Sequence, residues 1–370
     1  MLKIFNSGKT NYDFLLLISV IFISCFGLLM VYSTSSVYAL EVYGDPSRFL
    51  KLHLIYLTLG LAAMVMFMHI DYRILRKFVY PAYIICLILL IVVLIPGVGK
   101  KVSGAQRWLV LGPLTFQPSE IAKFVILLYL AHSLDKKRDM IDSFSVGFLS
   151  HILVAGTFIA LIFVEPDFGT SVTILILLIM MMFIGNVKIR YIMPMLVLAA
   201  GFSVMAILTK SYRMDRLLSF LDPWKDPLGS GYQAVQSFIA FGVGGLYGMG
   251  LGDSTQKLFF LPQAHTDFIF SIIGEELGFI GVVAIIATFL FILYRSIRIG
   301  IKAPDLFGCY LVCGFTLLIA IQAAMNMAVS VGLFPTKGLT LPFISYGGSS
   351  LVCSLAAMGI ILSVSKAEVK

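Results

Sequence analysis

A carboxylate, Asp267, stands at the start of a long apolar run, and this position could support proton-transfer chemistry. The run, residues 268–294, is long enough to cross a bilayer. On an ideal helix, Asp267, Ser271 and Glu275 recur every four residues and share one side. A carboxylate at the mouth of a membrane span, with a polar stripe below it, resembles one wall of a water-filled cavity. The alternative is that Thr266 or Asp267 only caps the helix, and periodicity alone weighs the two equally.

Other charged side chains lie near the ends of apolar runs. Glu120 and Lys123 are three residues apart, so they lie on one helix face, where they either neutralise each other or serve a ligand. Arg107 stands beside Trp108, and Trp favours the headgroup level of a membrane. Chemistry alone slightly favours an anchor at the membrane interface for Arg107 over bidentate binding of a phosphate by its guanidinium.

A second carboxylate, Asp167, lies in a short turn between two apolar runs. The turn contains Pro166, Asp167 and Gly169, which are ordinary turn formers, so its composition has a purely structural explanation. The functional alternative is that Asp167 faces Asp267 across a cleft or ligates a divalent cation.

Composition restricts the class of protein. Of the 370 residues, 59% are hydrophobic and only 12% are charged, whereas a soluble domain has about 25% charged residues. The chain is therefore expected to be a single integral membrane domain, residues 1–370, that is all-α and crosses the bilayer several times. The net charge of +8 does not indicate nucleic-acid binding, because Lys and Arg cluster in short loops between the apolar runs.

Ten membrane spans are predicted, with a large loop, residues 210–267, before the eighth. The spans are 13–33, 51–69, 79–97, 118–134, 146–164, 170–186, 191–209, 268–294, 309–330 and 346–365. Basic residues occupy alternate loops and both ends of the chain, for example Lys3, Lys9, Arg73, Arg76, Lys136, Lys188, Arg295 and Lys370. The positive-inside rule places these loops and both termini in the cytoplasm, so the long loops are expected to be extracytoplasmic.

Six separated motifs, in the same order, make the whole chain resemble the SEDS (FtsW/RodA) family of bacterial peptidoglycan glycosyltransferases. They are GAQRW at 104–108, QPSEIAK at 117–123, PDFGT at 166–170, LPQAHTDFIF at 261–270, GEELG at 274–278 and SYGGS at 345–349. The chain is closest to the FtsW branch, because LDPWKDP at 221–227, KLFFL at 257–261 and PTKGLTLPFISYGGSS at 335–350 are similar to that branch. Gln263 is a departure, since a Glu is common at that position in the family.

The resemblance implies that the chain polymerises lipid II into glycan strands at the outer leaflet of the bacterial cytoplasmic (inner) membrane, for septal synthesis in cell division. A sugar 4-hydroxyl attacks the anomeric carbon of the donor with inversion, and undecaprenyl diphosphate leaves. Asp267 matches the catalytic aspartate, which acts as the base. The expected substrate-binding residues are Arg107, Gln117, Glu120, Lys123, Asp167, His265 and Lys337. A divalent cation, Mg or Mn, is expected as the cofactor, with Asp167 and Asp267 as candidate ligands.

The resemblance also implies partners and leaves other functions to be weighed. The expected partners are a class B penicillin-binding protein transpeptidase (FtsI-like) and other divisome membrane proteins, with no nucleic acid. The main alternative function is a lipid II flippase. Glu275 and Glu276 are the residues that best support this alternative, because ionisable groups inside a span mark transport pathways. A transporter should hold its site near the midplane, whereas the charged motifs here cluster at outer loop ends, which favours the enzyme. A scaffold with vestigial catalytic groups is a third possibility.

Overall fold

The computed structural model describes residues 12–102, 105–112, 114–209 and 211–367, so Lys3, Lys9, Gly104 and Lys370 lie outside the described residues. Most of these residues are helical, which confirms the all-α fold. The α-helices are α1 (Phe14–Tyr43), α2 (Arg48–His69), α3 (Leu75–Leu94), α4 (Pro118–Lys136), α5 (Ser150–Val164), α6 (Phe168–Ile184), α7 (Ile189–Leu208), α8 (Ser211–Leu221), α9 (Tyr232–Gly244), α10 (Ile269–Ile301), α11 (Leu306–Ser330) and α12 (Gly348–Ala367).

Each of the ten predicted spans contains a helix, α1 to α7 and α10 to α12. In the described part of the chain, eight helical segments are long and apolar enough to cross a membrane, and they include all of these helices except α4 and α6. The chain is therefore a multi-pass membrane protein. Helix α4 carries charged residues near both ends, and α6 has only 17 residues. The total of ten crossings accordingly stays a prediction.

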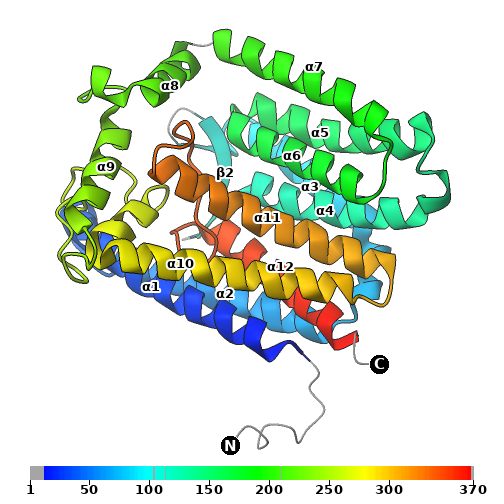
Figure 1. Cartoon of the computed structure of the whole chain (residues 1–370), viewed down its shortest axis with the longest axis horizontal. Coiled ribbons are helices and arrows are strands. Elements are labelled where there is room, and N and C mark those ends of the chain that lie inside the picture. The colour runs from blue at the N-terminus through cyan, green and yellow to red at the C-terminus, as the bar shows by residue number, and fades with distance from the viewer. Residues whose placement is uncertain (1–11, 103–104, 113, 210, 368–370) are drawn as a thin grey trace, which may run out of the picture.

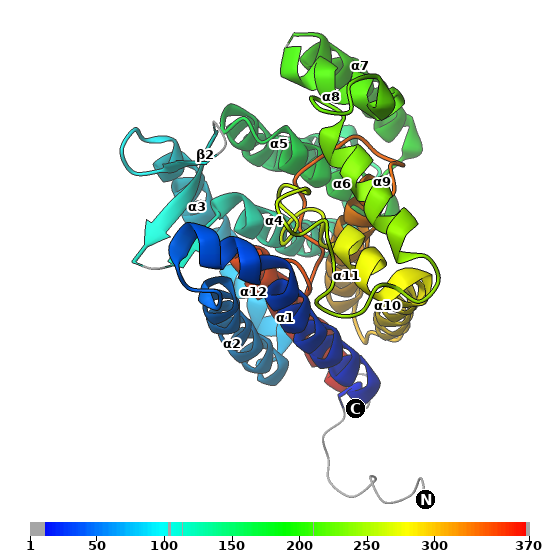
Figure 2. The same ribbon diagram turned by 90° about the vertical axis from the view of Figure 1, so that its left-hand side faces the viewer.

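The helices pack around a central group made of α4, α11 and α12. In the most apolar 18-residue stretch of α12, 94% of the residues are buried, compared with 22% for the corresponding stretch of α10 and 11% for that of α7. Figure 2 shows α1 and α2 on one side of α12, and α10 beside α11. Helices α2 and α12 form the most extensive pair because glycine allows close approach: a side chain at Gly359 would overlap the backbone of Met64. The outer helices, with α7 the most peripheral, expose the apolar side chains that a membrane protein presents to lipid (Figure 1).

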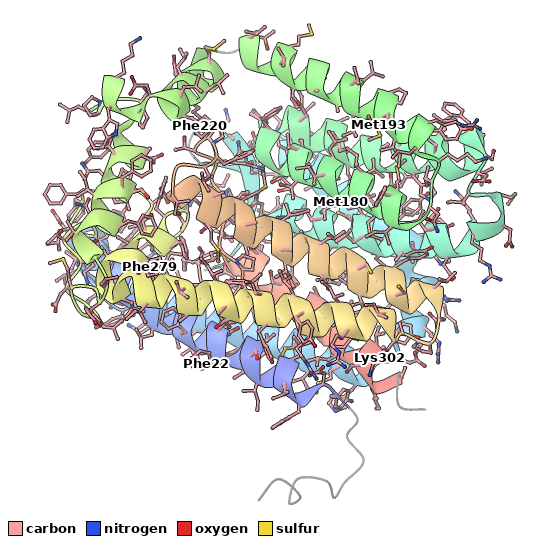
Figure 3. All side chains as sticks on the ribbon, in the orientation of Figure 1. Phe22, Met180, Met193, Phe220, Phe279 and Lys302 are labelled. Atoms are coloured by element: carbon pink, nitrogen blue, oxygen red, sulfur yellow. The ribbon has the colours of Figure 1, made fainter. Side chains whose placement is uncertain are left out.

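The two ends of the bundle differ in character. The described ends of the chain lie close together at one end (Figure 1), where the backbone N–H of Asp13 donates to the Ser365 hydroxyl at 3.1 Å. Basic residues gather at this end and pair with acids: Arg295 with Asp13 at 2.6 Å, Arg76 with Asp135 at 3.0 Å, Arg73 with Asp305 at 2.9 Å and Lys188 with Asp142 at 3.1 Å. Figure 3 shows that α10 runs along the bundle from Phe279, near the opposite end, to Lys302 at the basic end.

The opposite end carries the irregular connections, and it includes a small sheet that the sequence did not predict. The strands β1 (Lys100–Val102), β2 (Ala105–Leu111) and β3 (Leu114–Phe116) form an antiparallel sheet in the order β1-β2-β3. The register pairs Lys100 with Trp108 and Val110 with Thr115. The tight turn between β2 and β3 includes Gly112, whose φ of 62° suits a residue without a Cβ. This sheet positions Arg107 near the turn before α6.

The large loop between α7 and α10 also holds helices. The predicted short helix at residues 231–237 is part of α9, which packs on α10 and α11 and buries Ala234, Val235 and Ser237. Helix α10 is kinked at Gly278, which has a φ of 64° and lies against Gly248 of this loop. The kink separates a short segment next to the loop from the long remainder of α10.

Candidate active site

Asp267 lies just before α10, in a segment whose backbone is fixed by three hydrogen bonds. The side-chain amide of Asn326, in α11, donates to the carbonyl of Asp267 at 2.8 Å. The Ser345 hydroxyl donates to the carbonyl of Thr266 at 2.6 Å, and the backbone N–H of Tyr346 donates to the carbonyl of His265 at 2.9 Å. Three consecutive carbonyls are therefore tied to α11 and to the segment before α12, which holds the Asp267 carboxylate in a defined position.

The Asp267 carboxylate is half-buried and faces the last long loop, between α11 and α12. A Cβ added at Gly338 would lie 2.9 Å from Asp267 Oδ2, so glycine leaves room for the carboxylate. Burial raises the pKa of Asp267 to about 6, and the positive charge of Arg216 in α8 partly opposes this rise. At neutral pH the carboxylate is ionised, and its raised pKa makes it a better proton acceptor than an ordinary aspartate.

Asp167 is the N-cap of α6, and it links the turn before α6 to the start of α4. Its carboxylate accepts hydrogen bonds from the backbone N–H of Thr170 at 3.0 Å and the Thr170 hydroxyl at 2.9 Å. The amide of Gln117, just before α4, lies 3.5 Å from Asp167 Oδ2, and the backbone N–H of Gln117 donates to the Ser349 hydroxyl at 3.0 Å. The predicted turn role of Asp167 is thus present, and it places the carboxylate beside Gln117.

Lys337 lies in the loop between α11 and α12, where this loop meets the turn that holds Asp167 and the segment that holds Asp267. Its side chain packs on Gly169, where a Cβ would overlap it, and its ammonium donates to the Thr173 hydroxyl at 3.2 Å. The next residue, Gly338, contacts Asp267. Burial lowers the pKa of Lys337 to about 8; Asp167 opposes this shift and Lys123 adds to it. The loop residues 337 and 338 therefore bring the Asp167 turn and the Asp267 segment to one place.

Lys123 and Glu120 form an ion pair on one face of α4, as their spacing predicted. The distance between Lys123 Nζ and Glu120 Oε1 is 2.7 Å, and the Lys123 side chain is only 1% exposed. Because a buried ammonium needs an opposite charge, Glu120 stabilises Lys123 where it lies. Lys123 also acts electrostatically on Lys337. Lys337 is thus within electrostatic reach of Lys123 and Asp167, and Gln117 lies beside Asp167.

Arg107 holds the turn before α6 through backbone atoms. From β2, its guanidinium donates to the carbonyl of Glu165 at 3.2 Å and to the carbonyl of Pro166 at 2.5 Å. The interfacial anchor and the phosphate-binding role of Arg107 both stay predictions. The Glu165 carboxyl is fully buried without a hydrogen-bond partner among the described residues. Burial, with the nearby charge of Asp167, raises the pKa of Glu165 to about 8, although Arg107 opposes the rise, so Glu165 is protonated at neutral pH.

His265 packs against aromatic side chains. Its ring stacks on Tyr38 with the centroids 5.8 Å apart and lies 4.8 Å from the Phe49 ring. Burial lowers the pKa of His265 to about 4, so the imidazole is neutral. The structure therefore places His265 in an aromatic cluster beside the site, and its predicted role in substrate binding stays a prediction.

The polar stripe expected below Asp267 does not line an open cavity, so that part of the prediction is wrong. Ser271 is fully buried and its hydroxyl pairs with the Ser237 hydroxyl of α9 at 2.6 Å. The Glu275 carboxylate accepts the backbone N–H of Thr255 at 2.9 Å and the Ser254 hydroxyl, so it anchors the loop. Backbone and hydroxyl donors from the loop before α10 thus take the place that water was expected to fill.

Glu276 has a similar structural use. It pairs with Lys257 at 2.9 Å and accepts the Ser33 hydroxyl of α1 at 2.6 Å. The side chains of Lys257 and Glu276 are 6% and 0% exposed. Both glutamates of α10 are therefore buried and engaged in holding the loop that carries Asp267.

A divalent cation fits this site only if the substrate completes its coordination. Among the described residues, no group of three or more His, Cys, Asp or Glu side chains could hold a metal ion. Mg²⁺ commonly uses one or two protein carboxylates and takes its remaining ligands from water and substrate phosphates. Asp167 and Asp267 are the candidate carboxylates near residues 337 and 338, and their role in binding a cation stays a prediction.

Comparison with known proteins identifies the chain's relatives. Residues 13–370 match the FtsW/RodA/SpoVE family, described as cell cycle proteins. This chain belongs to the FtsW/RodA/SpoVE family. It is 45% identical to a "Probable peptidoglycan glycosyltransferase FtsW" of Geobacter sp. (strain M18), over 96% of this chain and 97% of the relative. It is 42% identical to stage V sporulation protein E of Bacillus subtilis (strain 168), over 98% and 99% of the two chains.

Solved structures share the fold of this chain. One, reported as the structural coordination of polymerization and crosslinking by a peptidoglycan synthase complex, is 30% identical with a TM-score of 0.77, over 96% of this chain and 98% of that chain. The rod shape determining protein RodA of Thermus thermophilus is 27% identical with a TM-score of 0.71, over 97% and 98% of the chains. The arrangement of helices around the site is thus the one found in this family.

Sequence reasoning missed several residues that shape the site. Asn326 stands out in retrospect as an amide inside an apolar span, where an unpaired polar group is costly. Glu165 directly precedes the Pro-Asp turn but was not singled out. Arg216 and Ser349 act on Asp267 and Gln117 from distant segments, and no local signal indicated these contacts.

Proposed function

We propose that this protein is a peptidoglycan glycosyltransferase that polymerises lipid II into glycan strands, with Asp267 as the general base. The single observation that carries the proposal is the position of Asp267. This half-buried carboxylate, fixed through its backbone, stands beside Gly338, and the preceding residue, Lys337, packs on the turn that holds Asp167. A site that joins sugars through a diphosphate leaving group needs a base on one side and positive charge on the other.

The reaction is an inverting displacement. The Asp267 carboxylate takes the proton of the sugar 4-hydroxyl as its oxygen attacks the anomeric carbon of the donor. A new C–O bond forms while the bond from that carbon to the diphosphate oxygen breaks, so the electron pair leaves with undecaprenyl diphosphate. A positioned base contributes about 10²–10⁴-fold in rate. This use of a carboxylate parallels inverting glycosidases, in which one carboxylate activates the nucleophile.

Positive charge for the diphosphate comes from Lys337 and Lys123, and Arg107 contributes from the turn before α6. Lys337 is only half-buried and has no acid partner as close as Glu120 is to Lys123, so it is the lysine best placed to meet an anionic substrate. Gln117 supplies a neutral amide donor in the same group. A divalent cation held by Asp167 and Asp267 would add charge compensation for the diphosphate.

The site belongs at the outer membrane surface. Basic residues collect at the opposite end of the bundle, and the positive-inside rule assigns that end, with both termini, to the cytoplasm. The relatives named FtsW favour a septal role in cell division. The solved peptidoglycan synthase complex favours a class B penicillin-binding protein as the partner that cross-links the strands.

The test is polymerisation by the purified protein in liposomes that contain lipid II, with and without the transpeptidase. Polymer from the wild type, and its loss in Asp267→Asn, is the expected result. Asp253→Asn is the matched control, because Asp253 is an exposed aspartate of the same loop. Unimpaired polymerisation by Asp267→Asn would exclude Asp267 as the base.

The flippase alternative is weaker because its best features have other uses. Glu275 and Glu276 are bound to the loop at residues 252–257, as described above. The same liposomes report on this alternative: transfer of labelled lipid II between leaflets without any polymer would favour transport.

A further inference from the structure

An aromatic cluster lies next to Asp267, and we call six of its rings the aromatic shelf; the cluster also includes the fully buried His53 ring, 6.1 Å from that of Tyr346. Neighbouring ring centroids are 4.8 to 6.1 Å apart. The rings come from the end of α1, the start of α2, the loop before α10 and the segment before α12. They belong to Tyr38, Tyr43, Phe49, Phe259, His265 and Tyr346.

The outer rings of the shelf are exposed, whereas a ring beneath them is buried. Tyr43 and Phe259 are 46% and 48% exposed, whereas Phe49 is 9% exposed. Phe259 has a φ of 68°, a left-handed conformation that a bulky side chain rarely adopts. Burial of the ring does not explain this conformation, because half of the ring is exposed. Such positions persist where the surrounding structure enforces them, and they are common at ligand-binding sites.

Charged groups border the open side of the shelf. The Arg48 guanidinium lies over the Tyr43 ring, 4.2 Å from its centroid. Asp45 accepts the Ser47 hydroxyl at 2.6 Å and pairs with the exposed Lys51 at 2.9 Å. Hydrated charges at this edge place it in water rather than among acyl chains, and they provide donors and acceptors for hydroxyl groups.

The shelf is rigidly connected to the proposed base. His265 is two residues before Asp267, and two residues span about 7 Å at most. The carbonyls of His265 and Asp267 are both fixed by hydrogen bonds, to Tyr346 and Asn326. A polymer that reaches Asp267 with one sugar therefore has its neighbouring sugars within reach of the shelf.

We propose that the aromatic shelf binds the sugar rings of the growing glycan strand. The face of a pyranose ring presents C–H groups, which pack against the electron-rich face of an aromatic ring, while the ring hydroxyls bond to polar groups at the border. This inference rests on the proposed function, since it names a binding subsite of the same reaction. The shelf retains the strand between additions, whereas the chemical step belongs to Asp267.

The test separates the first coupling from later elongation. Tyr38→Leu, Tyr43→Leu and Phe259→Leu remove one ring each and keep an apolar side chain; Tyr247→Leu is the control, because Tyr247 is an 81% exposed aromatic of the same extracytoplasmic loop as Phe259. Reconstituted protein in liposomes with excess labelled lipid II is assayed for the rate of dimer formation and for strand length. We expect an unchanged dimer rate and a mean strand length about tenfold shorter, which corresponds to about 1.4 kcal/mol of strand binding.

The outcomes are distinguishable. Wild-type strand length in Tyr43→Leu and Phe259→Leu, the two most exposed positions, would overturn the shelf and leave the glycosyltransferase standing. Equal shortening by Tyr247→Leu would also overturn it, because the effect would then be a general property of exposed rings. Failure of the wild type to polymerise lipid II would overturn the proposed function instead. Thermal melting of each variant shows whether loss of folding is responsible, and Phe259→Leu, at an exposed loop position, avoids the helix packing of Tyr38.

Discussion

The side-chain amide of Asn326 donates to the backbone carbonyl of Asp267 at 2.8 Å and to that of Leu339 at 2.6 Å. One amide group thus joins the segment that carries the proposed base to the loop that carries Lys337. Asn326 is 1% exposed, so no solvent replaces these bonds. The relative position of the two sides of the site therefore depends on a residue that touches neither substrate nor solvent.

Replacing Asn326 with Ala should lower the turnover of lipid II more than it lowers substrate affinity. A displacement of about 1 Å at the reacting group costs about 10²-fold in rate, so we expect kcat to fall by about that factor while KM changes little. Steady-state kinetics in liposomes test this. Thr316→Ala, in the same helix, is the control, because its buried hydroxyl has no partner among the described residues. Equal kcat values for the two variants would contradict the positioning role of Asn326.

The activity should follow a bell-shaped pH profile with an optimum near neutrality. Asp267 must be ionised to accept a proton, so activity is lost as the pH falls through the Asp267 pKa of about 6. Lys337 must be protonated to meet the diphosphate, so activity is lost as the pH rises through the Lys337 pKa of about 8. The pH dependence of kcat/KM between pH 5 and 9.5 measures both limbs.

Two substitutions should each move one limb of that profile. Arg216→Gln removes the positive charge that lowers the Asp267 pKa, so the acid limb should shift to higher pH. Lys337→Arg keeps the charge over the whole range, so the alkaline limb should disappear. An unchanged acid limb in Arg216→Gln would show that another group controls it.

Asp267→Asn should increase the thermal stability of the protein at pH 7 although it removes activity. Burial raises the pKa of Asp267 from 3.8 to about 6, so the folded state holds this proton more tightly than the unfolded state. Stability is therefore lost as the pH rises from about 4 through 6, and the neutral amide avoids the loss. Melting temperatures at pH 4.5 and 7.5 should show a larger gain for Asp267→Asn at the higher pH. Asp253→Asn should show no such difference.

Breaking the buried pair between Lys257 and Glu276 should destabilise the protein. Lys257→Met leaves the Glu276 carboxylate buried and uncompensated, which costs about 3–5 kcal/mol. The double variant Lys257→Met/Glu276→Leu should recover most of the loss, because an apolar pair of similar size carries no desolvation penalty. Thermal melting in detergent compares the three proteins. Failure of the double variant to recover would mean that the pair has a role beyond charge compensation.

The sequence predicted the helices well because the membrane imposes a simple rule. Long apolar runs separated by charged loops mark spans, and every predicted range contains a helix. The pairing of Glu120 with Lys123 followed from their spacing on one helix face. The small sheet at residues 100–116 was missed, since short strands in a loop have no strong periodic signal.

The interior of the site was harder to predict, because its contacts join distant segments. Asn326 and Asp267 are 59 residues apart in the chain, and Gln117 and Ser349 are 232 apart. Ser271 and Glu275 lie in α10 as predicted, whereas Asp267 lies before the helix. The stripe was wrongly assigned to water, because the hydrogen-bond donors of the loop before α10 had no local signature. Periodicity shows which side chains share a face, and tertiary packing decides what that face meets.

The ion pair between Asp13 and Arg295 has a consequence for biosynthesis. Asp13 begins α1, and Arg295 lies in α10, 282 residues later. At about 5–20 residues per second, the ribosome needs roughly 15 to 60 s to produce the partner of this aspartate. The first helix is thus made long before the partner that secures its N-terminal end. A chain stopped before Arg295 would leave Asp13 without its counter-ion, and quality-control proteases would have a feature that distinguishes incomplete copies.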